Sequence, residues 1–431
     1  MKRLSTPRPD RQAAKAPRRA KACAGSPESP LGVSWRSWRL GGHVTAPALP
    51  SAGSPSLPTR SVLVWIVLGL VLGLLPQSAR AEDAPGIHEL TPTTEAAIQR
   101  GIDFLIEKQD HSGKGSWGGD FKLASTSLAG LALVASGDSY NRGHAGHAIA
   151  DAVHYLLTIA KTEVRGRPDQ CFFSDGQKQQ GRVHAHGFAM LFLAEVYGHT
   201  TKELDAEIKR ALRGAVSVSL EAQTDAGGWG YSFRFDPEWG SGDQDEGSVT
   251  VTQVQALRAA RNVGIYVPTD AIGRALGYLK RSMNTVDGAC KYSLSKSFDP
   301  KEASRRSFEL TAAAVSTLNA SGIYIGAGGA HSNELTRGLE YLRTTMKTYK
   351  NPFFAATDFR FYGNFYAAQA MFQAEPRDWE AWYAPVYQEL VNQQLDSGGW
   401  KQERNFGEAY STASALLILQ LPRRYLPIFQ R

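Results

Sequence analysis

Two helical patterns alternate along residues 94–422, and this internal repetition limits the possible folds more than any other feature of the sequence. The first pattern is Arg-Gly-x-x-aromatic-Leu at 100–105 and 337–342, with weaker copies at 151–156 and 274–279. The second is a stretch of small and apolar residues ending in glycine or proline, at 126–137, 187–198, 251–264, 310–322, 366–376 and 410–422. Glycine and proline after such a stretch stop a helix, so the sequence predicts six helix pairs. These pairs occupy the whole of 94–422 and leave no room for a second domain.

The two helix types differ in where their polar residues lie. The Arg-Gly helices are amphipathic, with Asp103, Glu107 and Lys108 on one side, so they are expected in an outer layer. The small-residue helices are apolar on more than one face and are expected inside. Six inner helices ringed by six outer ones form an all-α fold, the α/α toroid. An open solenoid is the alternative, but the repeats lack polar capping units, which favours a closed ring.

The positive charge of the protein is concentrated at its amino terminus. The net charge is +7, yet residues 1–81 hold 12 basic residues against only Asp10 and Glu28, so the remainder is mildly acidic. An acidic body argues against nucleic-acid binding. The hydrophobic content of 42% is typical of a globular protein.

The first 81 residues predict export. Residues 1–60 are rich in Pro, Ser, Ala and Arg and are expected to be a disordered basic tail. An apolar run at 62–75 is followed by Pro76 and by Ala-Arg-Ala at 79–81, as in a signal peptide. Residues 61–81 are therefore expected to be a signal peptide or an uncleaved membrane anchor, and 82–431 a single periplasmic or extracellular toroid domain. If uncleaved, 61–75 would associate with the membrane.

Tryptophan or cysteine marks the turn within most helix pairs. The markers Trp117, Cys171, Trp229, Cys290 and Trp400 recur about every 55 residues or a multiple of it, and the fifth turn, at 353–362, lacks one. The segments 223–229 and 394–400 both read Gln-x-x-x-Gly-x-Trp. With the Arg-Gly helices, this pattern resembles the QW repeat of squalene–hopene cyclases and their relatives. The resemblance covers about 94–422 and implies the terpene cyclase/protein prenyltransferase toroid, which non-catalytic thioester-type domains share, without implying a reaction.

An acidic cluster directly before the third inner helix is the strongest candidate for chemistry. Asp243, Asp245 and Glu246 resemble the Asp-x-Asp-Asp of class II terpene cyclases, whose middle aspartate protonates an alkene or epoxide. The resemblance implies Asp245 as the acid. Clustered carboxylates can keep one of their number protonated, because like charges disfavour ionising together. The alternative is a solvated acidic loop at a helix start.

Residues before the other inner helices are candidates for ligand binding at the same rim of the ring. The segment 185–187, Ala-His-Gly, resembles the Ala-His-Gly-Gly of protein prenyltransferases, which contacts an isoprenoid diphosphate. Aromatic walls stabilise carbocations in cyclases through their π faces. For each residue the alternative is plain packing or capping. The candidate ligand-binding residues are His184, His186, Tyr292, Tyr362, Tyr366 and Tyr410.

A zinc site is not expected. Asp287, Cys290 and Tyr292 resemble the Asp-Gly-Cys-Tyr-Ser of prenyltransferases, but an alanine is inserted. The later His331 follows the inner helix instead of lying on the next one, so the Asp/Cys/His ligand set is incomplete. The sequence predicts no cofactor, and it predicts free thiols at Cys171 and Cys290.

Three functions remain open at this point. The first is an exported toroid that binds an isoprenoid or other apolar ligand in a central cavity, with or without catalysis. The second is a class II-type cyclase that starts cyclisation with Asp245 as the acid. The third is a non-catalytic toroid that binds a protein or a glycan. A phosphate-binding glycine loop, a dinucleotide fingerprint and a Ser-His-Asp motif are absent from the sequence.

Overall fold

A computed structural model describes residues 90–112, 114–164, 166–175, 182–233, 244–295, 299–321 and 333–429, all within one compact unit that spans 79–431. The expected basic tail at 1–60 and the targeting segment at 61–81 lie outside these residues. Within the described ranges, no helix is both long and apolar enough to span a membrane.

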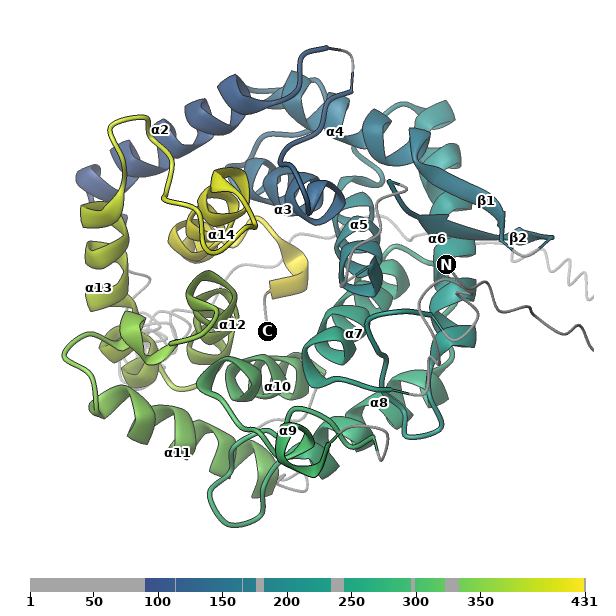
Figure 1. Ribbon diagram of the computed structural model, residues 1–431. Helices are drawn as coiled ribbons and strands as arrows, with labels where there is room; N and C mark the ends of the chain where they lie inside the picture. Colours follow the sequence, from purple (N-terminus) through teal and green to yellow (C-terminus); the bar gives the residue numbers. More distant parts are fainter. Residues whose placement is uncertain are drawn as a thin grey trace, which may run out of the picture. The chain divides into compact units, whose positions relative to one another are not determined.

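In the described part of the chain, twelve principal helices form two concentric rings (Figure 1). Each inner helix contacts the next one, and the last, α14, contacts the first, α3, so the ring is closed. The inner helices are α3 (Lys122–Val134), α5 (Arg182–Val196), α7 (Gly247–Asn262), α10 (Phe308–Ala320), α12 (Arg360–Gln373) and α14 (Glu408–Gln420). The outer helices are α2 (Pro92–Lys108), α4 (Gly146–Thr158), α6 (Lys202–Ala222), α8 (Thr269–Ser282), α11 (Asn333–Lys347) and α13 (Pro376–Gln393). The predicted α/α toroid is therefore confirmed.

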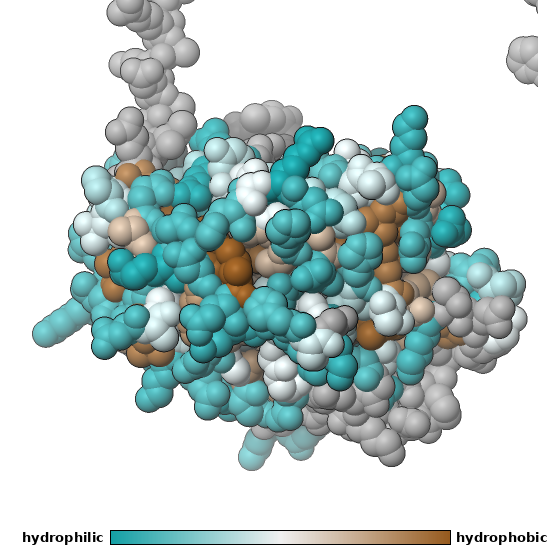
Figure 2. Space-filling view, turned by 90° about the horizontal axis from the view of Figure 1, so that it is seen from above, coloured by the Kyte–Doolittle hydropathy of each residue, from teal (hydrophilic) through white to brown (hydrophobic). Residues whose placement is uncertain are grey.

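The polarity of each helix decides its ring. The inner helices are buried nearly all round, and the residues expected in the inner layer, Thr126, Val251, Leu310 and Thr412, are all buried there. The outer helices bury one face only, as α8 does with Ala275, Tyr278 and Leu279. Their other faces form the outer wall, which is mostly hydrophilic with small hydrophobic areas on the side shown in Figure 2.

Glutamine at the end of an outer helix ties that helix to the next outer helix. The Nε2 of Gln223 donates to the carbonyl of Gly227 in its own turn and to that of Ala271 in α8, both at 2.9 Å. Gln109 makes the same pair of bonds to Gly115 and Ala148. Gln394 repeats them with Gly398 and with Ala97, which belongs to α2, so the same contact that joins successive repeats also closes the ring.

The turn tryptophans link each turn to the two helices that it connects. Trp229 is 1% exposed. Its backbone N donates to Thr250 Oγ1 in α7 at 3.0 Å, and its indole Nε1 donates to the carbonyl of Ser219 in α6 at 2.7 Å. Trp117 and Trp400 make equivalent bonds. Cys290 keeps only the backbone bond, to Thr311, because a thiol cannot reach the outer helix as an indole does.

A glycine in each of these turns lets the next outer helix approach closely. Gly227 has φ of +94°, a conformation that favours glycine. A Cβ there would lie 2.4 Å from the carbonyl oxygen of Arg274 in α8. Gly398 meets the carbonyl of Arg100 in the same way, at 2.5 Å. The glycine of the turn and the arginine of the Arg-Gly pattern are therefore two sides of one contact.

The second turn contains a hairpin that the sequence did not predict. Strands β1 (Ala160–Val164) and β2 (Arg167–Phe173) pair antiparallel, with Ala160 opposite Phe173. Cys171 lies on β2 and packs against Gly214 of α6, where a Cβ would meet its own Cβ at 2.7 Å. Cys171 and Cys290 are both buried free thiols, and burial raises the pKa of each to about 12.

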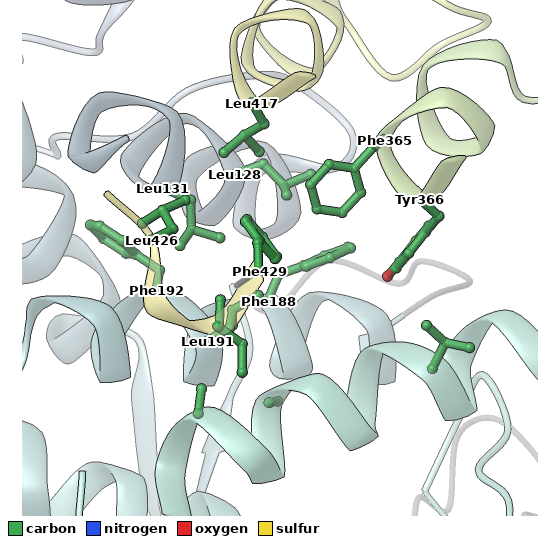
Figure 3. Packing of buried hydrophobic residues seen from close by; sticks show 14 of the residues in the cluster. Leu128, Leu131, Phe188, Leu191, Phe192, Phe365, Tyr366, Leu417, Leu426 and Phe429 are labelled. Atoms are coloured by element: carbon green, nitrogen blue, oxygen red, sulfur yellow. The ribbon is translucent and has the colours of Figure 1, made fainter. Parts of the chain in front are cut away.

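The C-terminal segment closes one end of the ring. After α14, the short helices η2 (Leu421–Arg423) and η3 (Pro427–Phe429) bring the chain back to the middle of the ring (Figure 1). Figure 3 shows the side chains of Leu426 and Phe429 among apolar residues of the inner helices. Phe429 packs edge-on against Phe365, with ring centroids 5.4 Å apart, and both are buried. The ring is therefore filled by apolar side chains at the end where the C-terminal segment lies.

Candidate functional site

Glu246 is a buried carboxyl at the start of an inner helix, at the end of the ring that the C-terminal segment leaves free. It is the N-cap of α7, and its side chain accepts a hydrogen bond from the backbone N of Val249 at 2.9 Å. It is only 1% exposed. Burial raises the pKa of Glu246 to about 7, although hydrogen bonds from Ser248 and Val249 and the charge of Arg305 act in the opposite direction. A substantial fraction of Glu246 is therefore protonated at neutral pH.

A chain of hydrogen bonds links Glu246 to a histidine on the neighbouring inner helix. The Ser248 hydroxyl bonds to Glu246 Oε2, and it lies 3.0 Å from Nε2 of His184 in α5. The Nδ1 of His184 lies 3.0 Å from the Thr252 hydroxyl, one turn further along α7. The four side chains form one continuous path between a carboxyl and an imidazole.

Donor and acceptor counts allow two proton arrangements along this path. With Glu246 ionised, Ser248 donates to it and accepts from His184 Nε2–H, while Thr252 donates to Nδ1. With Glu246 protonated through Oε2, the directions reverse, and Nδ1–H of His184 donates to Thr252. Only the second arrangement leaves the Thr252 proton free for the carbonyl of Ser248, 3.1 Å away. The second arrangement holds one proton more than the first, so passing between them takes one proton in or out at Thr252 and leaves the imidazole neutral.

His184 remains neutral in this environment. Burial lowers its pKa to about 4, because the charged imidazolium would lose its hydration. A neutral imidazole carries one donor and one acceptor, which is what a relay between Ser248 and Thr252 requires.

Aromatic side chains surround the path. The Tyr231 and Tyr292 hydroxyls are 2.9 Å apart, and the rings of Tyr362 and Tyr366 have centroids 4.8 Å apart. The Tyr366 hydroxyl lies 3.4 Å from Thr252. Burial raises the pKa of Tyr362, and the charge of Glu246 adds to this effect. The structure therefore brings together the expected His184, Tyr292, Tyr362, Tyr366 and Tyr410, of which all but the buried Tyr366 are half-buried.

Three members of this group were missed in the sequence: Tyr231, Ser248 and Thr252. Ser248 and Thr252 are four residues apart on a helix, so they lie on one face, which faces His184. This spacing is visible in the sequence, but its partner on α5 is not. Tyr231 follows the turn marker Trp229 and its position depends on the loop path.

Asp245 points away from this centre. Its Oδ1 accepts hydrogen bonds from the hydroxyl of Tyr278 in the outer helix α8 at 2.8 Å, and from Ser293 Oγ and Leu294 N, both at 3.0 Å. It is 2% exposed. These contacts hold the 293–294 segment against the start of α7, and they do not favour Asp245 as a proton donor to a ligand in the ring. Asp243 lies outside the described residues.

His186 also faces the outer layer. Its Nδ1 accepts from the backbone N of Phe173 and its Nε2 faces the carbonyl of Ala215 in α6, both at 3.3 Å. It is fully buried among Phe172, Phe173 and Phe233, and burial lowers its pKa to about 4. The imidazole therefore fixes the hairpin to α6 and does not join His184.

The prenyltransferase-like segment at 287–292 holds structural contacts. Asp287 pairs with Arg306 and accepts a hydrogen bond from the backbone N of Ala289 at 3.0 Å. Cys290 Sγ contacts the carbonyl of Lys291 at 3.4 Å. Across the described part of the chain, no group of three or more His, Cys, Asp or Glu side chains could hold a metal ion.

Comparisons with known proteins support the fold. No protein-family model and no curated protein matches the sequence. Among solved structures, a family 76 glycoside hydrolase from a bovine Bacteroides thetaiotaomicron strain has a TM-score of 0.55 at 9% identity, over 77% of this chain and 78% of its own. The GH76A α-1,6-mannanase of Salegentibacter sp. has a TM-score of 0.53 at 10% identity, over 77% of this chain and 99% of its own.

A terpene cyclase is also similar. The type II terpene cyclase MstE from Scytonema, in complex with geranylgeranyl dihydroxybenzoate, has a TM-score of 0.49 at 14% identity, over 78% of this chain and 98% of its own. The two GH76 enzymes, each with a TM-score above 0.5, share the α/α toroid with this protein. At identities this low, a shared fold does not imply a shared activity.

Proposed function

We propose that this toroid binds an uncharged, isoprenoid-like ligand at the rim of the inner helices and that Glu246 protonates it. The single observation that carries the proposal is a buried carboxyl with a pKa near 7, joined to a neutral histidine and enclosed by tyrosine rings. A carboxylic acid that stays protonated at neutral pH is the group that acid-initiated chemistry requires. The proposal moves the role of acid from Asp245 to its neighbour.

The local groups fit each step of an acid-initiated isomerisation. Glu246 gives its proton to an alkene carbon, which leaves a carbocation on the ligand. The Ser248 hydroxyl and the Val249 N–H donate to the new carboxylate and stabilise it. The π faces of Tyr292, Tyr362 and Tyr366 stabilise the cation. The carbocation then loses a proton to the Thr252 hydroxyl, and a new double bond forms. Thr252 passes its own proton to Nδ1 of His184, and the Nε2 proton moves through Ser248 to Glu246, which restores the acid.

Deuterium incorporation tests this proposal. Linear isoprenoid alcohols and epoxides are incubated with the purified protein in deuterated buffer, and the products are separated by mass and retention. The proposal predicts an isomer that carries one deuterium. The Glu246→Gln variant should yield none, while Asp243→Asn should still yield it. Failure of the native protein to alter any prenyl chain, or turnover that survives Glu246→Gln, refutes the proposal.

Glycan binding is the second candidate function. It is favoured by the polar character of the rim, where tyrosine hydroxyls, His184 and Ser248 surround Glu246, and by the fold shared with mannanases. Glycoside hydrolysis requires two carboxyl groups about 5–9.5 Å apart. Among the described residues, Glu246 is the only carboxyl in this network. This candidate therefore predicts glycan binding without hydrolysis. Titration with α-1,6-mannotriose, monitored by tyrosine fluorescence, separates the two candidate functions. The glycan candidate predicts a response, and the isoprenoid proposal predicts none.

A further inference from the structure

A cavity of about 400 Å³ lies at the opposite end of the inner helices from Glu246. It is lined by residues at the C-terminal ends of α3, α5 and α7, among them Val134, Val196 and Asn262, and by Tyr425 and Pro427 of the C-terminal segment. Its volume falls within the range of about 300–1,000 Å³ of small-molecule sites. It shares no lining residue with the Glu246 centre.

The electrostatic environment of this cavity favours positive charge. The C-terminal end of a helix carries a partial negative charge, and three such ends meet here. Two acidic side chains, Asp138 and Glu195, add to it, and the described lining contains no lysine or arginine. Asp138 is held by a hydrogen bond from the backbone N of Ala145 at 2.9 Å. Glu195 is half-buried, and burial raises its pKa to about 7, opposed by a hydrogen bond from Ile428.

Aromatic rings complete the lining. The Tyr140 hydroxyl bonds to Nε2 of His154 at 2.9 Å, which fixes the ring at the cavity wall. Tyr425 reaches the cavity over Gly137, where a Cβ would lie 3.1 Å from the tyrosine ring. Aromatic faces beside carboxylates are the chemistry that recognises quaternary and alkylated ammonium groups.

We propose that this cavity is a binding site for a small organic cation of the alkylammonium class. Glu195 and Asp138 supply the opposite charge, and the rings of Tyr140 and Tyr425 contact the apolar substituents on the nitrogen. Pro427 and Tyr425 belong to the C-terminal segment, which closes one end of the ring. The bound cation therefore also stabilises that segment.

Isothermal titration of the full-length protein with choline tests the proposal. The titration is run at pH 8.5, above the pKa of Glu195, beside the uncharged isostere in which carbon replaces the choline nitrogen. We expect choline to bind at least tenfold more tightly than the isostere. Equal affinity for both, or no heat from choline up to tens of millimolar, overturns the proposal.

Two pairs of variants locate the site. Glu195→Gln should weaken choline binding about tenfold or more, whereas Glu207→Gln on the exposed face of α6 should leave it unchanged. Tyr425→Leu should weaken binding and Tyr425→Phe should retain it, because only the ring is needed. Because Tyr425 is 55% exposed, its replacement should leave the fold intact. It therefore still tests the site if Glu195→Gln does not fold. Choline binding that is insensitive to both Glu195→Gln and Tyr425→Leu overturns the assignment.

Discussion

Replacement of Gln394 by leucine tests whether the ring is closed in solution. In the closed ring, the Nε2 of Gln394 donates to the carbonyl of Ala97 at 2.8 Å and to that of Gly398 at 2.7 Å. Ala97 lies in the first outer helix and Gln394 directly after the last, so this bond spans the two ends of the repeat array. Leucine has a similar volume and cannot donate.

The expected cost follows from the two bonds to carbonyls, because the Arg100 guanidinium, which also donates to Gln394 Oε1, is exposed and can bind water instead. Each hydrogen bond to a backbone carbonyl contributes about 0.5–1.5 kcal/mol net, so Gln394→Leu should lower the free energy of unfolding by about 1–3 kcal/mol. Gln223→Leu removes the equivalent bonds inside the array and should cost a similar amount. Urea unfolding followed by far-ultraviolet circular dichroism measures both. Gln402→Leu, on an exposed side chain near the same turn, is the matched control and should change little.

An open array gives a different result. The Ala97 carbonyl would then be hydrated, and Gln394→Leu would lose only the bond to Gly398, at a cost of about 0.5–1.5 kcal/mol, roughly half that of Gln223→Leu. Such a result, together with a full cost for Gln223→Leu, refutes the closed ring. Similar losses for both substitutions confirm it.

Three further predictions concern the turn tryptophan, the Glu246 carboxyl and export. Trp229→Ala should cost about 3–5 kcal/mol of unfolding free energy, measured by urea unfolding, because the indole is fully buried; an unchanged midpoint would contradict the structural role of the turn. The pKa of Glu246 is raised in the folded protein, so its contribution to stability is complete below the unfolded pKa and is lost as pH rises through about 7. The native protein should therefore lose up to about 3 kcal/mol relative to Glu246→Gln between pH 4.5 and 8, and parallel stability profiles would contradict this. A fusion of residues 1–90 to a reporter active only outside the cytoplasm should give signal, and deletion of 61–75 should abolish it.

The ring itself could be predicted from the sequence because its signals are local. Helix stops, amphipathic periodicity and the Gln-to-Trp turns recur within short windows, and each one corresponds to contacts within a repeat or with its neighbour. The hairpin at 160–173 and the C-terminal segment carry no such repeat. Phe429 reaches the middle of the ring only because the surrounding inner helices leave an apolar space there, which depends on the whole assembly.

The sequence places the candidate residues at the starts of inner helices, but it does not determine which way their side chains point. Glu246 has extended backbone, with φ of −151° and ψ of 139°, and successive side chains in extended chain point to opposite sides. Asp245 and Glu246 therefore cannot both face the centre. His184 and His186 lie two apart on a helix and also point apart. The sequence analysis placed both members of each pair at the same rim, and the contacts to α6 and α8 show which member faces the outer layer instead.

Titration of Glu246 tests directly whether this carboxyl can act as the acid. Infrared difference spectra of the native protein against Glu246→Gln, recorded from pH 4 to pH 9, isolate the carbonyl stretch of this one protonated carboxyl. If Glu246 is the acid, this band persists at pH 6 and disappears with a midpoint near 7, because burial raises the pKa of the carboxyl. Loss of the band with a midpoint near the ordinary value of about 4.3 would show that Glu246 is ionised at neutral pH and cannot be the acid.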